Sequence, residues 1–178
     1  MSKLIMGIGI PGSGKTTALT KFAEKNLYTY ICPDDIRKEF TGDTGNQTKN
    51  KEVWEEAYKR TADALKEGKT VVFDATFTNE NQRRQFITFA KNNGASKVQG
   101  VFADASLEIS RDRNTQRERV VPELAMMRMH QFLQENPPIL EDGFDSLFTM
   151  DEFQNLERAE IHSQGQEVIS KEFQPKFK

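Results

Sequence analysis

The sequence predicts an α/β fold in which a central parallel sheet lies between layers of helices. Short apolar segments alternate with longer amphipathic segments along most of the chain. This alternation is typical of parallel strands joined by right-handed helical crossovers. In addition, the first apolar segment runs directly into a glycine-rich loop, Gly9–Thr16, and then into a segment of helical spacing. Strand, glycine loop and helix in this order bind phosphate, so the predicted class is a three-layer, P-loop NTPase-like fold.

The composition fits one soluble globular domain. The chain has 178 residues, of which 36% are hydrophobic and 29% charged, and its formal net charge is −2. Proteins that coat long nucleic acids are usually strongly basic, so this balance argues against a broad nucleic-acid groove but allows a pocket for one strand end. No apolar run approaches the roughly 20 residues of a membrane span, and we expect neither a membrane segment nor a signal peptide. The single cysteine, Cys32, excludes an internal disulfide and favours a cytoplasmic location.

The order of strands and helices follows from hydrophobic spacing and from the residues that end each segment. Lys51–Glu67, for example, repeats apolar residues at helical spacing and is ended by Gly68. We expect strands at Lys3–Ile8, Asn26–Cys32, Lys69–Phe73, Lys97–Ala103 and Asp145–Met150. We expect helices at Thr17–Lys25, Asp34–Phe40, Lys51–Glu67 and Asn79–Asn93, another from the Ser106 cap through Arg111–Arg119, and a last one from Pro122 to near Pro137. Thr41–Asn50, rich in Gly, Thr and Asn, is expected to be a mobile loop.

The glycine loop fits the pattern G-x-x-x-x-G-K-[ST]. Its glycines let backbone N–H groups turn around phosphate oxygens, and the N-terminus of the next helix adds partial positive charge. We expect Lys15 to reach the β- and γ-phosphates of ATP and the Thr16 hydroxyl to bind Mg²⁺. The other contacts to the ATP phosphates are expected from Gly12, Ser13, Gly14 and Thr17.

Two carboxylates follow strands whose carboxyl ends meet this loop. Asp34 comes two residues after the second predicted strand and three before Arg37. Phosphoryl transfer needs a carboxylate near the attacking hydroxyl and cations near the phosphate, so we expect Asp34 as general base and Arg37 as a contact to the acceptor. Asp74 closes the third strand as a Walker B carboxylate would, and Thr76 could help to position the acceptor. The structural alternatives are a helix cap for Asp34 and a strand-end turn for Asp74.

Arg113 and Arg117 are four residues apart in a predicted helix, so we expect them on one face. Two guanidinium groups there would suit triphosphate oxygens, and a lid at about residues 106–122 would close them over the nucleotide and exclude water. The alternative is a solvated basic face, because acidic residues lie close by. The lid belongs to one expected domain over residues 1–150, and residues 151–178 are expected to form a C-terminal extension packed on the same domain.

The motifs occur in the order G-x-x-G-S-G-K-T, D-x-x-R, V-V-F-D-A-T and R-N-x-x-R followed by V-P. In this order the chain resembles the 5′-hydroxyl polynucleotide kinase family, as in the kinase domain of the T-even phage end-healing enzyme and bacterial RNA-repair kinases. The resemblance runs from Lys3 to about Met150. It implies that Asp34 takes the proton from the 5′-hydroxyl end of DNA or RNA and that Arg37 contacts this end. It also implies acceptor- and metal-side roles for Asp74 and Thr76, a clamp on the donor phosphates by Arg113 and Arg117, and packing of Val121 on the terminal base.

The resemblance therefore favours an ATP- and Mg²⁺-dependent kinase whose partners are nucleic-acid 5′ ends. A small-molecule kinase of the zeta-toxin or antibiotic phosphotransferase type is the first alternative, because it would share the glycine loop and the base. A nucleotide-dependent switch is the second, and it would need a residue that positions water in place of an acceptor base. The sequence leaves open the choice between DNA and RNA, the preferred donor base and the oligomeric state.

Overall fold

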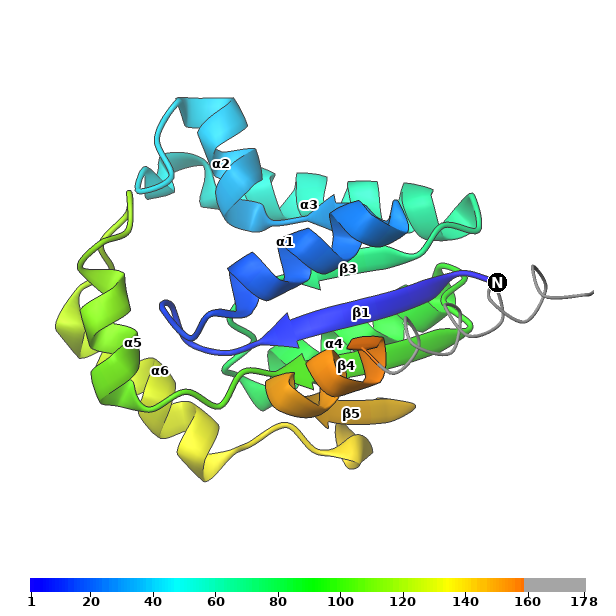
Figure 1. The fold of residues 1–178 in the computed structure, drawn as a ribbon. Helices are drawn as coiled ribbons and strands as arrows, with labels where there is room; N and C mark the ends of the chain where they lie inside the picture. The colour runs from blue at the N-terminus through cyan, green and yellow to red at the C-terminus, as the bar shows by residue number, and fades with distance from the viewer. Residues whose placement is uncertain (159–178) are drawn as a thin grey trace, which may run out of the picture.

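The computed structural model describes residues 1–158. Its centre is a sheet of five strands in the order β2-β3-β1-β4-β5 (Figure 1). The strands are β1 (Lys3–Ile8), β2 (Thr29–Ile31), β3 (Val71–Asp74), β4 (Lys97–Phe102) and β5 (Ser146–Thr149). All four pairings are parallel, because each connection between strands contains at least one helix. The predicted three-layer α/β fold is thereby confirmed.

Helices cover both faces of the sheet. One face packs against α1 (Lys15–Asn26) and helical residues 150–158, and the other packs against α3 (Asn50–Lys66), α4 (Glu80–Asn92) and α6 (Glu123–Glu135). The remaining helices, α2 (Pro33–Thr41) and α5 (Leu107–Asn114), lie toward the carboxyl end of β1, where the glycine loop also lies (Figure 1). Short 3₁₀ turns occur at η1 (Gln47–Lys49) and η2 (Leu140–Asp142).

Successive side chains of β1 enter two separate cores. Leu4 and Met6 belong to the larger core with α3 and α4, whereas Ile5 belongs to the smaller core with Leu19 of α1. In the smaller core, the rings of Phe153 and Phe22 lie 4.7 Å apart and join residues 150–158 to α1. The sheet is therefore buried on both faces, as expected for parallel strands with continuous apolar runs.

Three segments differ from the sequence-based expectation. β2 is shorter than Asn26–Cys32, because α1 continues to Asn26 and Leu27 ends it in a left-handed conformation with φ 56°. The expected loop Thr41–Asn50 contains the turn η1, whose Asn46 cap accepts a hydrogen bond from the Thr48 N–H. The helix expected through Arg119 stops at Asn114.

Most of the expected C-terminal extension, residues 159–178, lies outside the described residues. Within residues 1–158, every helix is too short or too polar to cross a membrane.

A buried arginine on α4 ties together three loops near the sheet. Arg83 is 0% exposed, and its Nε donates to Asp142 Oδ2 at 2.8 Å. Its two terminal nitrogens donate to the backbone oxygens of Phe77 at 3.0 Å and Asn136 at 2.9 Å. Arg83 therefore fixes the chain after Thr76 against the end of α6 and the turn η2.

Candidate active site

The glycine loop joins the carboxyl end of β1 to α1 and presents free hydrogen-bond donors. Gly12 and Gly14 have φ values of 80° and 87°, which favour glycine. Gly14 caps α1 without a side-chain hydrogen bond, so the N–H groups of the first turn stay available. The buried Ser13 hydroxyl also has no hydrogen-bond partner among the described residues. Such a cradle of donors at a helix N-terminus suits phosphate.

Asp74, at the end of β3, contacts the side chains of Lys15 and Thr16 in the loop. Its Oδ2 accepts hydrogen bonds from the Thr16 hydroxyl at 2.6 Å and the Tyr30 hydroxyl at 2.8 Å. Its Oδ1 lies 3.2 Å from Lys15 Nζ. Burial and the negative charge of Asp74 raise the pKa of Tyr30, so this phenol keeps its proton and donates. Asp74 is thus more than a strand-end turn residue, because it organises both Lys15 and Thr16.

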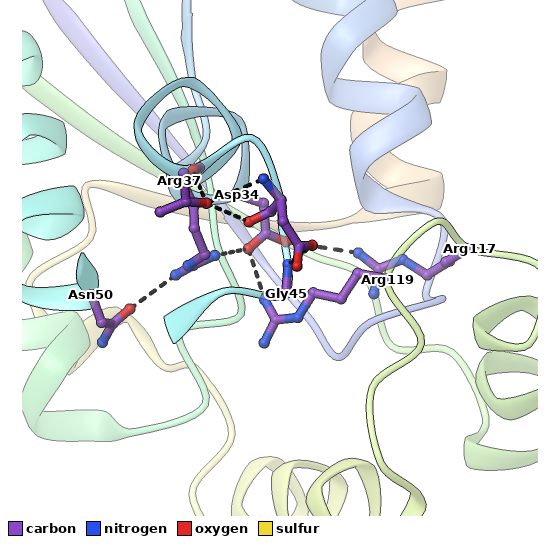
Figure 2. Close-up of polar contacts among 8 residues, drawn as sticks. Asp34, Arg37, Gly45, Asn50, Arg117 and Arg119 are labelled. Atoms are coloured by element: carbon purple, nitrogen blue, oxygen red, sulfur yellow. Dashed lines mark hydrogen bonds and ion pairs between the residues drawn. The ribbon is translucent and has the colours of Figure 1, made fainter. Parts of the chain in front are cut away.

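Asp34 lies in the first turn of α2, where three guanidinium groups face it (Figure 2). Its Oδ1 accepts from Arg37, one turn later, and from Arg119 Nη1 at 3.0 Å. Its Oδ2 lies 3.9 Å from Arg117 Nη2. The cap of α2 is Cys32 and makes no side-chain hydrogen bond, so Asp34 is not used as a helix cap. Its side chain is 35% exposed, which leaves the carboxylate reachable from the cavity beside it.

Arg37 is held in place from the opposite side. It is 4% exposed, and its Nη2 donates to Asn50 Oδ1, the first residue of α3, at 2.9 Å (Figure 2). The D-x-x-R spacing predicted the contact between Asp34 and Arg37, but nothing in the sequence pointed to Asn50.

The lid differs in detail from the expectation. Arg113 lies near the end of α5 and Arg117 in the irregular segment after it, so the prediction that they share a helix face is wrong. The helix ends because the side chain of Asn114 bonds the backbone of Val121, with Asn114 Nδ2 to the carbonyl at 2.8 Å and the Val121 N–H to Asn114 Oδ1 at 3.1 Å. Both arginines nevertheless line a cavity of about 360 Å³ together with residues 11–17.

Sequence reasoning missed Arg119, which lies in the same irregular segment. The helix expected through Arg119 ends at Asn114 instead, so only the place of Arg119 in an arginine-rich run could have pointed to it. The lid also contacts α2 through an ion pair between Lys38 Nζ and Glu118 at 3.1 Å. These contacts place the tip of the lid beside Asp34 (Figure 2).

One cavity of about 310 Å³ joins the glycine loop, α2, α3 and the lid. Thr76 and Val121 both line it, and Thr76 also accepts the Gly9 N–H through its carbonyl at 3.1 Å. The charged and polar lining includes Lys15, Thr16, Asp34, Arg37, Asn50, Asp74, Arg117 and Arg119. The apolar lining includes Trp54, Val121 and Met129. We refer to this space as the acceptor cavity.

A second cavity, of about 530 Å³, lies on the other side of the loop. Its lining includes Ser13, Gly14, Asp104, Arg113 and Gln154. The sequence did not predict it, because one wall is formed by the helical residues after β5, a stretch without clear periodicity.

Cys32 lines the acceptor cavity with a thiol that holds its proton. Burial, followed by the charge of Asp74, raises the pKa of its thiol to about 12. The thiol therefore stays protonated at neutral pH, which argues against a role as nucleophile.

The family of the chain follows from a match over most of its length. A model of the AAA domain family AAA_33 matches residues 4–136, from β1 through α6. The chain belongs to this family. The matched part of this AAA_33 domain contains the glycine loop, Asp34, Asp74 and the lid arginines.

Solved structures share the fold of this AAA_33 domain at low identity. A chain of the Pnkp1/Rnl/Hen1 RNA repair complex has a TM-score of 0.67 and 20% identity to this domain. The match covers 81% of this domain but only 46% of the chain in the complex. A protein of Chloroflexus aurantiacus, provisionally assigned as a kinase, has a TM-score of 0.62 and 16% identity, with 83% and 86% of the two chains covered. A gluconokinase of Sinorhizobium meliloti has a TM-score of 0.53 and 17% identity, with 83% and 82% covered. The chain therefore has a P-loop kinase fold.

Proposed function

We propose that this AAA_33 domain transfers the γ-phosphate of ATP to the 5′-hydroxyl end of DNA or RNA. The observation that carries the proposal is the position of Asp34, whose carboxylate lines the same cavity as Lys15 and Thr16. Phosphoryl transfer to an alcohol needs such a base beside the residues that bind the donor phosphates. Arg37 and Arg119 next to Asp34 supply positive charge for an acceptor phosphate, which a water nucleophile in a nucleotide-dependent switch would not need.

In the proposed reaction the acceptor hydroxyl lies between Asp34 and the γ-phosphate. Asp34 takes the hydroxyl proton while the oxygen forms its bond to phosphorus, and the bond from this phosphorus to the bridging oxygen breaks to release ADP. Lys15, Arg113 and Arg117 stabilise the charge on the phosphate oxygens. Arg37 orients the Asp34 carboxylate from the buried side.

The residues at the end of the loop fit a Mg²⁺ ion. Thr16 and Asp74 offer oxygen atoms 2.6 Å apart. Asp74 Oδ1 faces Lys15 Nζ at 3.2 Å but makes no hydrogen bond within the described residues. Bound Mg²⁺ would neutralise charge on the β- and γ-phosphates. The nucleoside of ATP fits the cavity of about 530 Å³, which adjoins the loop at Ser13 and Gly14.

The walls of the acceptor cavity support a nucleotide as acceptor. Trp54 and Val121 supply apolar surface for a base, and Arg37 and Arg119 supply cations for a phosphate. The volume of about 310 Å³ also favours a second candidate, a small-molecule kinase whose acceptor is a single sugar-sized metabolite.

The proposal is tested with γ-labelled ATP, Mg²⁺ and short DNA and RNA oligonucleotides that carry a 5′-hydroxyl. We expect label at the 5′ end of at least one strand. Asp34→Asn should lower kcat by about 10²- to 10⁴-fold, the usual effect of losing a general base, with an unchanged Kd for ATP. Asp35→Asn is the matched control, because the next carboxylate of α2 is exposed and should have nearly normal activity.

Two results would contradict the proposal. Equal losses in Asp34→Asn and Asp35→Asn would remove Asp34 from the chemistry. Absence of label on every oligonucleotide, with ATP bound normally and a small alcohol phosphorylated, would establish the second candidate instead.

A further inference from the structure

Trp54 forms the wall between the acceptor cavity and a shallow groove on the outer face of α3. It lines both spaces. The groove has a volume of about 460 Å³, is lined by Lys51, Trp54, Glu55 and Tyr58, and presents an almost wholly apolar surface. We call it the α3 groove. Because the two spaces share Trp54, a ligand that fills the acceptor cavity would have its next unit close to the α3 groove.

The α3 groove lies beside the acceptor cavity along one side of the helix. Asn50, which bonds Arg37, is followed by Trp54 and Tyr58 at successive intervals of four residues. Residues at this spacing lie one above the other on a helix, about 6 Å apart along its axis. The groove thus begins one helical turn from the residues that hold Arg37 beside Asp34.

The two aromatic rings of the groove are fixed from the inside and partly open on the outside. Trp54 lies 6.1 Å from Phe73, and Tyr58 lies 4.5 Å from Phe89, measured between ring centroids. The Trp54 and Tyr58 rings are 6.4 Å apart. Both side chains are half-buried. Rings held in place from below offer stacking surface at little entropic cost, since they do not need to be ordered on binding.

A cation lies at the rim of this surface. The Lys51 side chain is 85% exposed, and its Nζ lies 3.8 Å from Glu55 Oε1. An ion pair this exposed contributes little stability, so Lys51 can turn to a phosphate at small cost. Flat aromatic surface beside an exposed cation is the combination that binds single-stranded nucleic acid.

We propose that the α3 groove binds the second nucleotide of a single-stranded acceptor, with its base stacked on Trp54 and Tyr58 and a backbone phosphate beside Lys51. This inference rests on the proposed function, because the first nucleotide must place its 5′-hydroxyl at Asp34. It makes a strand of at least two nucleotides with an unpaired 5′ end the preferred acceptor. A base paired at the second position could not reach the groove.

Binding is measured through Trp54, the only tryptophan in the chain. Its fluorescence is titrated with thymidine 3′-monophosphate and with the 5′-hydroxyl dinucleotide of thymidine that carries a 3′-phosphate. We expect stronger quenching by the dinucleotide and a Kd about 5- to 150-fold lower, the range that corresponds to stacking one more base. Kinase assays should give a matching fall in KM.

Variants of α3 separate stacking from charge. Trp54→Ala should remove most of the KM advantage of the dinucleotide, and Trp54→Phe should keep part of it. Lys51→Ala should raise the dinucleotide KM about 2- to 5-fold and reduce the salt dependence of binding by one phosphate contact, a slope change of about 0.7. Glu55→Gln should lower the dinucleotide KM, because it removes the carboxylate that competes with the phosphate for Lys51.

Lys66→Ala is the matched control. This exposed lysine lies on the same helix, about 22 Å from Lys51 along its axis, and its loss should change nothing.

The outcomes show separately whether the groove assignment fails and whether the proposed kinase function fails. If both acceptors are phosphorylated with equal KM, or if Lys51→Ala and Lys66→Ala behave alike, the α3 groove is not an acceptor subsite although the kinase proposal stands. If neither acceptor is phosphorylated and neither quenches Trp54, the proposed function fails and the groove assignment falls with it.

Discussion

Arg83→Met tests the buried ion pair that holds the acceptor side of the molecule together. The variant keeps an unbranched apolar side chain in place of the arginine stem but removes every donor of the guanidinium. Asp142, whose side chain is 0% exposed, then loses the hydrogen bond from Nε at 2.8 Å. The carbonyl oxygens of Phe77 and Asn136 lose their donors as well.

The expected cost follows from the burial of both partners. Removing one member of a buried pair typically costs about 3–5 kcal/mol, because the remaining charge is left uncompensated. For a domain of this size, each kcal/mol lowers Tm by about 2–4 °C, so the midpoint should fall by about 6–20 °C. The double variant with Asp142→Leu should recover part of the loss, because no buried charge then remains unpaired.

Urea unfolding measures the free-energy cost and thermal melting measures the fall in Tm, both followed by circular dichroism, with Arg84→Met as the matched control. Arg84 is 47% exposed, pairs with Glu80 on its own helix and approaches Asp142 only to 3.6 Å. Its loss should cost less than about 1 kcal/mol. The reasoning is refuted if Arg83→Met costs no more than Arg84→Met, or if the single and double variants show no coupling.

Two further predictions concern the site. Arg119→Ala should lower kcat/KM for the acceptor about tenfold, because the charged hydrogen bond from Arg119 to Asp34 is lost. The Kd for ATP should stay within threefold. Arg119→Lys should restore part of this activity, and an unchanged kcat/KM in Arg119→Ala would show that the lid contact is not used. The thiol of Cys32 has a pKa raised from 9.0 to about 12 in the fold, so the unfolded chain loses this proton first as pH rises. The stability advantage of the native protein over Cys32→Ala is therefore complete below about pH 8 and should fall by about 1.4 kcal/mol between pH 8 and 10 in urea titrations, whereas a constant difference would contradict the raised pKa.

Local chemistry explains which parts of the site the sequence predicted. The glycine loop, Asp34 with Arg37, and Asp74 follow strands of a parallel sheet, and the carboxyl ends of such strands meet at one edge. Their positions directly after predicted strands were therefore enough to predict that they lie close together. Arg119 lies in a segment without a regular period, where the contacts between Asn114 and the Val121 backbone set the path of the chain.

Long-range packing accounts for the other features that the sequence did not predict. Asn50 meets Arg37 only because α3 packs beside α2, and the cavity next to the loop depends on how the helical residues after β5 pack against the sheet. The early end of α5 has a similar origin, because hydrophobic spacing does not predict the hydrogen bonds between the Asn114 side chain and the Val121 backbone.

The contact between the glycine loop and α5 determines which side chains position 12 can accept, as a comparison with Gly42 shows. Gly12 and Gly42 have nearly the same φ, 80° and 76°. A Cβ at position 42 would meet no atom within 4 Å, whereas a Cβ at position 12 would lie 2.3 Å from the carbonyl oxygen of Ser110. Asparagine, which accepts left-handed angles, is therefore suited to position 42 and barred from position 12. The loop is thus restricted at Gly12 by its neighbour across space as much as by its own backbone, and a library that varies both glycines would separate these two constraints.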